Sequence, residues 1–276
     1  MWLLYRVADF LALFACYVLR YRRKVVLQNL GRSFPEKSPA EIQGIARHFY
    51  FNLADVLVET LKTLTISKKS FNKHFLITNP EVFQQHLDQG RSIIGFGSHL
   101  CNWEWLLTGC RAHFKEPMMG VYQPLASPAA EKFMLKIRSR FGEGPVPMQH
   151  TLREIMRRRH IPSAWGLIAD QVPMRKSEKY WTQFLNQDTA FYNGPARIAQ
   201  KTGHAPVFAH LKRVRRGYYE LTFTDLGKFD TPANTFAVTE AYARALEEAI
   251  RQSPSDWLWS HKRWKHRRDP AQSPQT

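Results

Sequence analysis

The chain has 276 residues, of which 44% are apolar; this is enough to bury one substantial core and excludes a disordered chain. Lys and Arg number 40 against 23 Asp and Glu, so the formal net charge is +17. This balance indicates an anionic partner and leaves nucleic acid, an anionic membrane and acidic substrates open. The three cysteines form no CxxC pair and no even set, so a reducing compartment is the simpler inference.

The first 19 residues are mostly apolar, but Arg6 and Asp9 leave only about ten uninterrupted apolar residues against roughly 20 for a membrane span. A basic block follows at residues 20–24. A secretory signal would carry its charges before the apolar stretch and end in a small-residue cleavage site, and neither is present. We expect residues 1–24 to anchor a cytoplasmic body to the membrane, or to lie in the interface. An ordinary buried first helix is the alternative.

Residues 25–65 are helical in pattern, and Ser38, Pro39 and Glu41 predict a capping box at one helix start. Residues 68–79 read as a polar connection, and 80–90 as a short helix that ends at a glycine. Ser92 to Phe96 then form a predicted buried strand, and Asn102 begins the next helix.

His99 lies in the turn between this strand and this helix, five residues before Glu104. On one helix the two side chains would point about 140° apart, but from the turn His99 can meet a carboxylate in the first helical turn. A carboxylate there would orient the ring and raise its basicity, as a general base requires. A plain structural hydrogen bond is the alternative. Zinc is not expected, because His99, Cys101 and Glu104 lack the HExxH spacing and further ligands.

The remaining chain alternates between predicted strands and helices. We expect strands at 116–123, 145–148, 161–169, 206–214 and 218–226, helices at 127–142, 151–160 and 194–203, and a last helix from Thr235. Residues 173–193 read as a loop that is long enough for a lid or a membrane-contacting flap. This order predicts a single α/β domain with a mixed, mostly parallel central sheet flanked by helices.

Several polar residues stand out at element ends. Asp170 and Gln171 follow a predicted strand, as His99 does, which suggests a shared cleft at the carboxyl edge of the sheet. Arg138 and Arg140 end a helix, where they either complement the helix dipole or clamp an anion. The tail, WLWSHKRWKHRR, interleaves tryptophan with cations and suits nucleic acid and lipid headgroups equally well.

These blocks together resemble one family. HLCNWE at 99–104 resembles the H-x4-D/E signature of glycerolipid and lipid A acyltransferases, in its HxxNWE form. RSRFG at 138–142 resembles the family's R-x-R-x-G block, ADQ at 169–171 its strand-end DQ, NGPA at 193–196 its GPA helix start, and WLWSHKRWK its closing motif. The resemblance reaches to about residue 268 and is strongest to the late acyltransferases of lipid A biosynthesis. Gln123 and Asn186 depart from the family pattern.

The resemblance implies a membrane-bound O-acyltransferase that moves a fatty acyl group from acyl carrier protein to a hydroxyl of a lipid A precursor or related glycolipid. It implies His99 as general base with Glu104 as its partner, and Asn102, Arg138, Arg140, Asp170 and Gln171 as substrate-binding residues. It also implies no cofactor and no metal. The expected domains are an anchor at 1–24, a catalytic domain at 25–268 on the cytoplasmic side of the inner membrane, and a polar tail at 269–276.

Acyl carrier protein, lipid A phosphates and an anionic membrane surface are all acidic, which matches the basic charge. The alternatives are an acyltransferase of the same superfamily with another lipid acceptor, and a basic membrane-surface or nucleic-acid-binding protein without catalysis. Nucleic acid is not the expected partner, because no recognised RNA- or DNA-binding motif is present.

Overall fold

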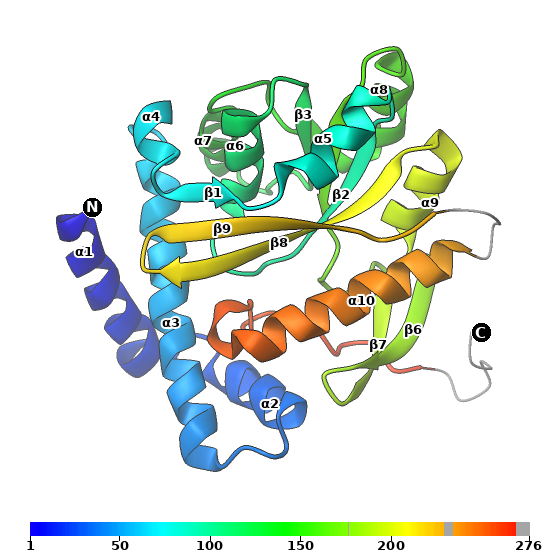
Figure 1. The fold of residues 1–276 in the computed structure, drawn as a ribbon. Helices are drawn as coiled ribbons and strands as arrows, with labels where there is room; N and C mark the ends of the chain where they lie inside the picture. The colour runs from blue at the N-terminus through cyan, green and yellow to red at the C-terminus, as the bar shows by residue number, and fades with distance from the viewer. Residues whose placement is uncertain (176, 229–233, 269–276) are drawn as a thin grey trace.

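A seven-stranded sheet forms the centre of the computed structural model, which describes residues 1–175, 177–228 and 234–268 (Figure 1). Its strand order is β1-β9-β8-β2-β5-β3-β4. The strands are β1 Phe75–Ile77, β2 Ile93–Gly97, β3 Met118–Tyr122, β4 Val146–Pro147, β5 Ala164–Ile168, β8 Ala205–Arg215 and β9 Tyr218–Asp225. All neighbours in this sheet pair in parallel except β8 and β9, which form a hairpin. The expected single α/β domain with a mostly parallel sheet is confirmed.

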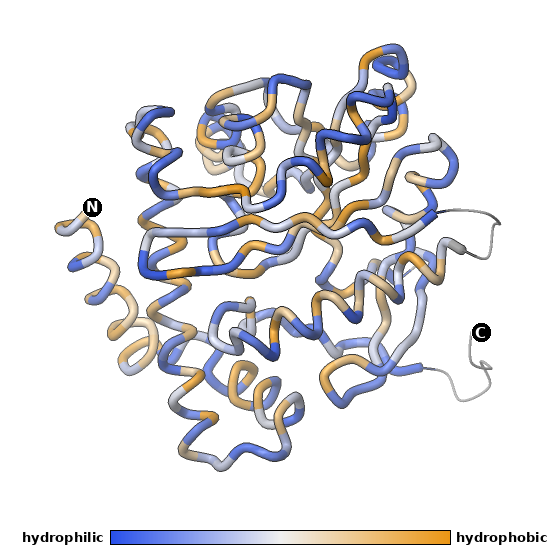
Figure 2. The backbone as a smooth tube through the Cα atoms, viewed as in Figure 1, coloured by the Kyte–Doolittle hydropathy of each residue, from blue (hydrophilic) through white to orange (hydrophobic). Residues whose placement is uncertain are grey.

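Helices cover both faces of the sheet because the central strands are apolar on both sides. Ile93 of β2 packs in one cluster with α4 Lys68–Phe71, α5 Pro80–Asp88 and α6 Glu104–His113. Ile94, the next residue, packs on the opposite face with α9 Gly194–Thr202 and α10 Asn234–Gln252. Two further helices, α7 Pro128–Arg138 and α8 Thr151–Arg157, flank β4 in the chain. Figure 2 shows hydrophobic segments both in the central strands and in the helices that surround them.

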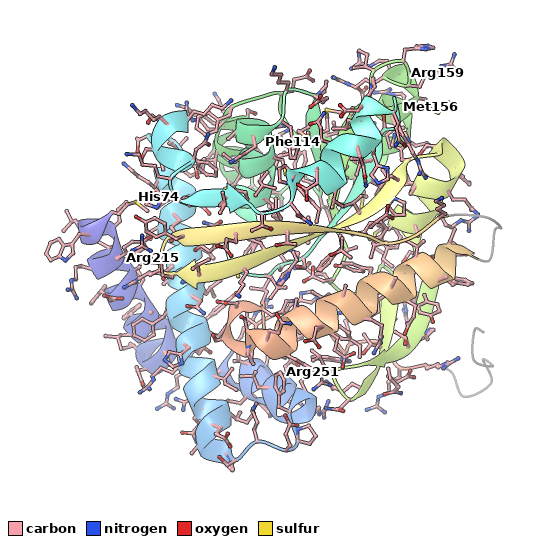
Figure 3. The ribbon with its side chains drawn as sticks, in the orientation of Figure 1. His74, Phe114, Met156, Arg159, Arg215 and Arg251 are labelled. Atoms are coloured by element: carbon pink, nitrogen blue, oxygen red, sulfur yellow. The ribbon has the colours of Figure 1, made fainter. Side chains whose placement is uncertain are left out.

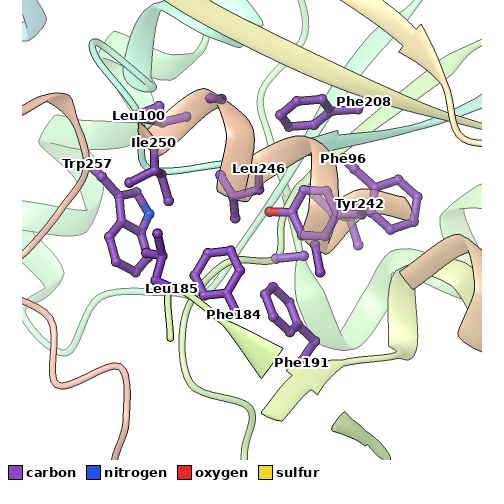
Figure 4. Close-up of a cluster of buried hydrophobic side chains, with 14 of the residues drawn as sticks. Phe96, Leu100, Phe184, Leu185, Phe191, Phe208, Tyr242, Leu246, Ile250 and Trp257 are labelled. Atoms are coloured by element: carbon purple, nitrogen blue, oxygen red, sulfur yellow. The ribbon is translucent and has the colours of Figure 1, made fainter. Parts of the chain in front are cut away.

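The core on the α10 side holds the end of β2 in place. Phe96 and Phe208 pack around Tyr242 of α10, and Figure 4 shows these rings in one cluster. The Tyr242 hydroxyl donates to the carbonyl of Gly97, at 2.8 Å. This contact fixes the last residue of β2, from which the loop that carries His99 starts.

The N-terminal part is a group of helices: α1 Trp2–Leu13, a π-helical turn at Phe14–Val18, α2 Arg23–Ser33 and α3 Pro39–Lys62. The capping box at Ser38 and Glu41 is confirmed, because each residue binds the other's backbone N–H. Helix α1 lies along α3 at one edge of the molecule, with Ala8 and Ala12 against Ala54 and Val58 (Figure 1).

The outer side of α1 and of the turn after it exposes large apolar side chains: Trp2, Leu3, Val7, Phe10, Leu13, Phe14, Tyr17, Val18 and Leu19. In the described part of the chain no single helix is long and apolar enough to cross a membrane. Residues 2–18 and α2 reach that length only together, and they are bent by 88°.

Two predicted connections are wrong. The expected loop at 173–193 contains a hairpin of β6 Lys179–Phe184 and β7 Gln187–Tyr192, whose turn residues Leu185 and Asn186 both have positive φ. A two-residue turn of this kind normally favours Asn-Gly, so Leu-Asn gave no clear hairpin signal. The connection at 68–79 contains α4 and the three-residue strand β1, which is too short to show a periodicity.

The basic, tryptophan-rich tail also differs from expectation. After a short 3₁₀ turn at Pro254–Asp256, the side chains of Trp257, Trp259 and Arg263 are buried in the protein. Neither tryptophan is therefore available to stack on nucleic acid or to sit among lipid headgroups. The predicted polar tail at 269–276 lies outside the described residues.

Candidate active site

His99 is placed by the loop between β2 and α6. Asn102 accepts a hydrogen bond from the backbone N–H of Trp105, at 3.2 Å, which starts α6 as predicted, and Cys101 just before it has a positive φ of 50°. This tight turn keeps His99 at the carboxyl end of β2. The His99 ring packs edge-on against Trp103, with 5.3 Å between the ring centroids.

Asp170 holds the His99 ring. Its Oδ1 lies 2.7 Å from Nδ1 of His99, while its Oδ2 accepts from the His99 backbone N–H at 2.8 Å and from the Trp257 indole at 2.7 Å. The two residues meet because β2 and β5 are parallel neighbours whose ends, Gly97 and Ile168, are in register. His99 and Gln171 therefore line a common cleft, as expected, and the buried Asp170 carboxylate that holds His99 has donors on both of its oxygens.

The charge of Asp170 is stabilised although the residue is buried. Burial alone would raise its pKa, but the interaction with His99 and the hydrogen bonds from His99 and Trp257 lower the pKa below its ordinary value. An ionised Asp170 accepts a hydrogen bond from Nδ1–H of His99, which leaves Nε2 unprotonated and able to accept. The Gln171 amide nitrogen lies 3.2 Å from this Nε2.

Glu104 does not contact the His99 ring nitrogens, so the expectation that it orients the imidazole is wrong. It instead pairs with Arg138 through two hydrogen bonds, from Nε at 2.9 Å and from Nη2 at 2.6 Å. A planar guanidinium matches a carboxylate in both positions, which explains why Glu104 turns toward α7. Burial would lower the pKa of Arg138, but the pairing with Glu104 raises it, so this cation stays charged.

Two other predicted substrate-binding residues lie away from this group. Asn102 is fully buried and donates to Glu59 of α3, at 2.7 Å. Arg140 donates to the backbone carbonyls of Thr63 and Ile66, at 3.2 and 2.9 Å. Both side chains tie α3 to the site region, and neither lines the cavity beside His99.

A cavity of about 390 Å³ opens beside His99 and runs between the sheet and α6. His99, Glu104, Arg138 and Gln171 contribute the polar part of its lining. The apolar part includes Phe83, Leu106, Leu107, Met118, Met119, Ile168 and Phe223. This volume lies in the ordinary range for a small-molecule pocket.

Glycines on three neighbouring strands form the wall of this cavity on the sheet side. Gly95 of β2, Gly166 of β5 and Gly120 of β3 stand side by side in the strand registers. A Cβ on Gly166 would meet nothing closer than a backbone oxygen at 3.9 Å, so the missing side chain leaves open space. A side chain at Gly166 would therefore occupy part of the pocket, whereas a Cβ on Gly120 would meet the Leu107 side chain at 2.6 Å.

Sequence reasoning missed the part that Trp257 plays. Its indole binds Asp170, and Leu100 next to His99 forms an isolated bridge with its backbone. The resemblance of the tail to a family motif indicated that the tail matters for function, but nothing in the local pattern indicated that it packs against the site.

Comparison with known proteins gives a consistent result. The model of a family described as bacterial lipid A biosynthesis acyltransferase matches residues 2–266. A lipid A biosynthesis palmitoleoyltransferase from Escherichia coli (strain K12) is 24% identical over 252 residues, which cover 90% of this chain and 80% of the relative. A lipid A biosynthesis acyltransferase from Shigella flexneri is similar to the same extent.

Proposed function

Since the chain belongs to the bacterial lipid A biosynthesis acyltransferase family, we propose that it moves a fatty acyl group from an acyl carrier protein thioester to a hydroxyl of a lipid A precursor or related glycolipid. The observation that carries this proposal is the placement of His99: its Nδ1 is held by Asp170, and its ring borders an apolar cavity. A base in the lining of a largely apolar pocket suits an alcohol and an acyl chain that meet there.

In the proposed reaction Nε2 of His99 takes the proton of the acceptor hydroxyl while the hydroxyl oxygen attacks the thioester carbonyl carbon. The carbon–sulfur bond then breaks, and the proton passes from His99 to the leaving thiolate. Asp170 keeps the ring in the tautomer that accepts at Nε2 and stabilises the imidazolium that forms. No covalent enzyme intermediate is required.

The cavity between the sheet and α6 is the proposed site for the acyl chain. Its apolar lining would bury hydrocarbon, and the carbonyl end of the acyl chain would lie near His99 and Gln171, which line the same cavity. The glycine wall makes room close to the sheet, so the substrate can lie along β2, β3 and β5.

Arg138 and Glu104 are proposed to act together at the mouth of this cavity. Glu104 fixes the guanidinium of Arg138, whose Nη1 is not engaged by Glu104. This group is suited to stabilise the negative charge that develops on the thioester oxygen, or to contact an acceptor phosphate. Glu104 then acts as a positioning residue for Arg138 and not for His99.

We further propose that the protein works at the cytoplasmic side of the inner membrane. The exposed apolar side chains of α1 and the turn that follows it support an anchor or a helix embedded in the interface, and the basic block at residues 20–24 adds attraction to anionic lipid. A basic surface also suits acyl carrier protein, which is acidic.

The test is transfer of labelled acyl groups from acyl carrier protein to a panel of lipid acceptors. His99→Ala should lower the transfer rate by roughly two to four decades, the usual contribution of general acid–base catalysis. His113→Ala is a matched control, because His113 ends α6 and does not line the cavity. Full activity of the His99→Ala protein would refute the role of His99 as general base. A coenzyme A thioester that is the better donor would refute acyl carrier protein as the donor.

A further inference from the structure

A second cavity, of about 290 Å³, lies among the N-terminal helices and shares no lining residue with the first. It is enclosed by the π-helical turn, the start of α2 and the first half of α3. Its lining consists of Cys16, Tyr17, Arg23, Leu27, Ala40, Gln43, Gly44, Ala46, Arg47 and Tyr50. The wall is therefore partly apolar and partly cationic.

Two arginines in this lining have no counterion. Within the part of the chain that the structure describes, the side chains of Arg23 and Arg47 make no ion pair and no hydrogen bond. Both guanidinium groups line the cavity together with Cys16, and their charges oppose the rise in the pKa of the Cys16 thiol that burial causes.

The arginines at the nearby β8–β9 turn differ from this pair, because each has a partner within the protein. Arg213 and Arg216 both bind Asp55 of α3, at 2.9 and 2.6 Å, and Arg216 also binds Asp9 of α1. Their neighbour Arg215 lies over the Tyr218 ring at the β8–β9 turn, near His74 (Figure 3). In the described part of the chain no carboxylate pairs with Arg23 or Arg47, and an anion bound in the cavity would supply that partner.

Gly44 keeps this cavity open. It lies in the interior of α3, where glycine is less favourable than alanine, and a Cβ there would meet no atom within 4 Å. The start of α2, whose first residue is Arg23, adds the positive end of a helix dipole.

The cavity also adjoins the surface that is suited to a membrane. Tyr17 lines it and is 51% exposed, and the next two residues, Val18 and Leu19, are exposed as well. A ligand here would have its polar part between two arginines and its apolar part next to exposed hydrocarbon side chains. Free phosphate would use only the first of these features.

We propose that this second cavity binds the phosphate headgroup of an anionic glycerophospholipid, with the phosphate between Arg23 and Arg47 and the adjoining hydrocarbon along Cys16, Leu27 and Ala46. The site is separate from the acyl-transfer site, and it would fix the height and orientation of the protein on the membrane through one specifically bound lipid. Guanidinium groups suit this role because their planar donors match phosphate oxygens.

The test measures binding of dihexanoyl phosphatidylglycerol to the full chain in neutral detergent by calorimetry. Arg23→Gln/Arg47→Gln should weaken binding by more than about tenfold, because two charge-assisted hydrogen-bonding partners are lost. Arg20→Gln/Lys24→Gln removes the same charge from the neighbouring block and should change affinity by less than about twofold, since a surface charge contributes little to a specific site.

A second pair of variants changes the shape of the cavity and leaves its charged residues in place. Gly44→Leu should fill the cavity and weaken binding by about tenfold or more, whereas Gly31→Leu, at an exposed glycine of α2 with equally open surroundings, should leave it unchanged. Thermal unfolding and acyl transfer, measured on each variant, identify any variant that is misfolded. If the glutamine variant is misfolded, Arg23→Lys/Arg47→Lys replaces it, because lysine keeps the charge but loses the planar guanidinium donors.

Three outcomes would overturn the proposal. Equal weakening by the two charge-removing pairs would indicate diffuse attraction, and equal binding of dihexanoyl phosphatidylcholine would remove the role of the anionic headgroup. Displacement of the lipid by millimolar inorganic phosphate with comparable affinity would assign the site to a free phosphate. A failure of the acyl-transfer assay would leave this measurement unaffected.

Discussion

Asp170 accepts three hydrogen bonds from two residues, and this accounts for much of the site's geometry. The backbone N–H of His99 fixes the loop, Nδ1 fixes the ring, and the Trp257 indole fixes the carboxylate itself. Each contact would have to be replaced by water if the carboxylate moved, and the residue is 1% exposed. These hydrogen bonds together give the ring of His99 one stable orientation.

Asp170→Asn is expected to lower the acyl-transfer kcat by at least a hundredfold with little change in KM. An amide nitrogen facing Nδ1 would favour the tautomer that protonates Nε2, which cannot then accept a proton; in the serine protease triad the equivalent change costs about 10⁴-fold. Asp188→Asn, at an exposed position of β7, is the control and should retain full activity. Comparable activity of Asp170→Asn would show that the orienting carboxylate is elsewhere, with Glu104 the next to test.

The stability that Asp170 provides should depend on pH. Its folded-state pKa lies below the unfolded value of about 3.9, so its contribution is fully present above that value and is lost as the pH falls through the folded pKa. The difference in unfolding free energy between wild type and Asp170→Asn, from urea titrations, should be constant from about pH 5 to 8 and shrink below about pH 4. A difference that grows in acid would contradict this assignment.

At the scale of elements, the central strands could be predicted because they are continuous apolar runs between breakers. The strand β2 is buried along nearly its whole length, and β3 and β5 begin with buried residues, which explains why length and flanking glycines sufficed. The hairpin of β6 and β7 was missed because Leu185 and Asn186 adopt positive φ without a glycine. Turn conformation of this kind depends on packing, since Leu185 is fully buried.

The partner of His99 was missed for a related reason. Glu104 is close in sequence, whereas Asp170 is 71 positions away and reaches the ring only through the pairing of β2 with β5. Sequence reasoning did place both Asp170 and His99 at strand ends and expected a common cleft. It could not decide which carboxylate faces the imidazole, because that depends on strand register and on the competing attraction of Arg138 for Glu104.

The glycine wall formed by these strands should limit acyl length. The leucine of Gly166→Leu would project into open space without backbone strain. We expect kcat/KM for the longest accepted acyl chain to fall by more than about tenfold relative to shorter chains. The reason is that binding of one methylene group in an apolar pocket contributes about 1–3 kcal/mol. The measurement is competition between acyl carrier protein thioesters of different length. Gly166→Ala is the small control. A uniform loss for all lengths would indicate a role other than chain accommodation.

At the scale of the whole molecule, the exposed apolar side chains of α1 and the net charge of +17 both favour binding to an anionic membrane, but they act over different distances. The charge attracts an anionic surface over roughly 10 Å in salt solution, whereas the apolar side chains act only on contact. Many of the exposed large apolar side chains belong to α1 and the turn after it, and α1 lies at one edge of the molecule (Figure 1).

Phe10→Asp/Val18→Asp should therefore release the protein from the membrane fraction in about 1 M salt, where screening suppresses the charge contribution. Both side chains are 66% exposed, so folding should be unaffected. Leu152→Asp/Met156→Asp is the control, because it makes the same change at exposed positions on α8. Retention of the first variant at high salt, judged by flotation with vesicles, would show that α1 is not the anchor.

The contact between Trp257 and Asp170 has a consequence for biosynthesis. A ribosome delivers His99 and Asp170 well before it delivers Trp257, so a nascent polypeptide lacks the indole that steadies the carboxylate. We expect the emerging enzyme to stay inactive until the segment that contains Trp257 has been translated and has docked.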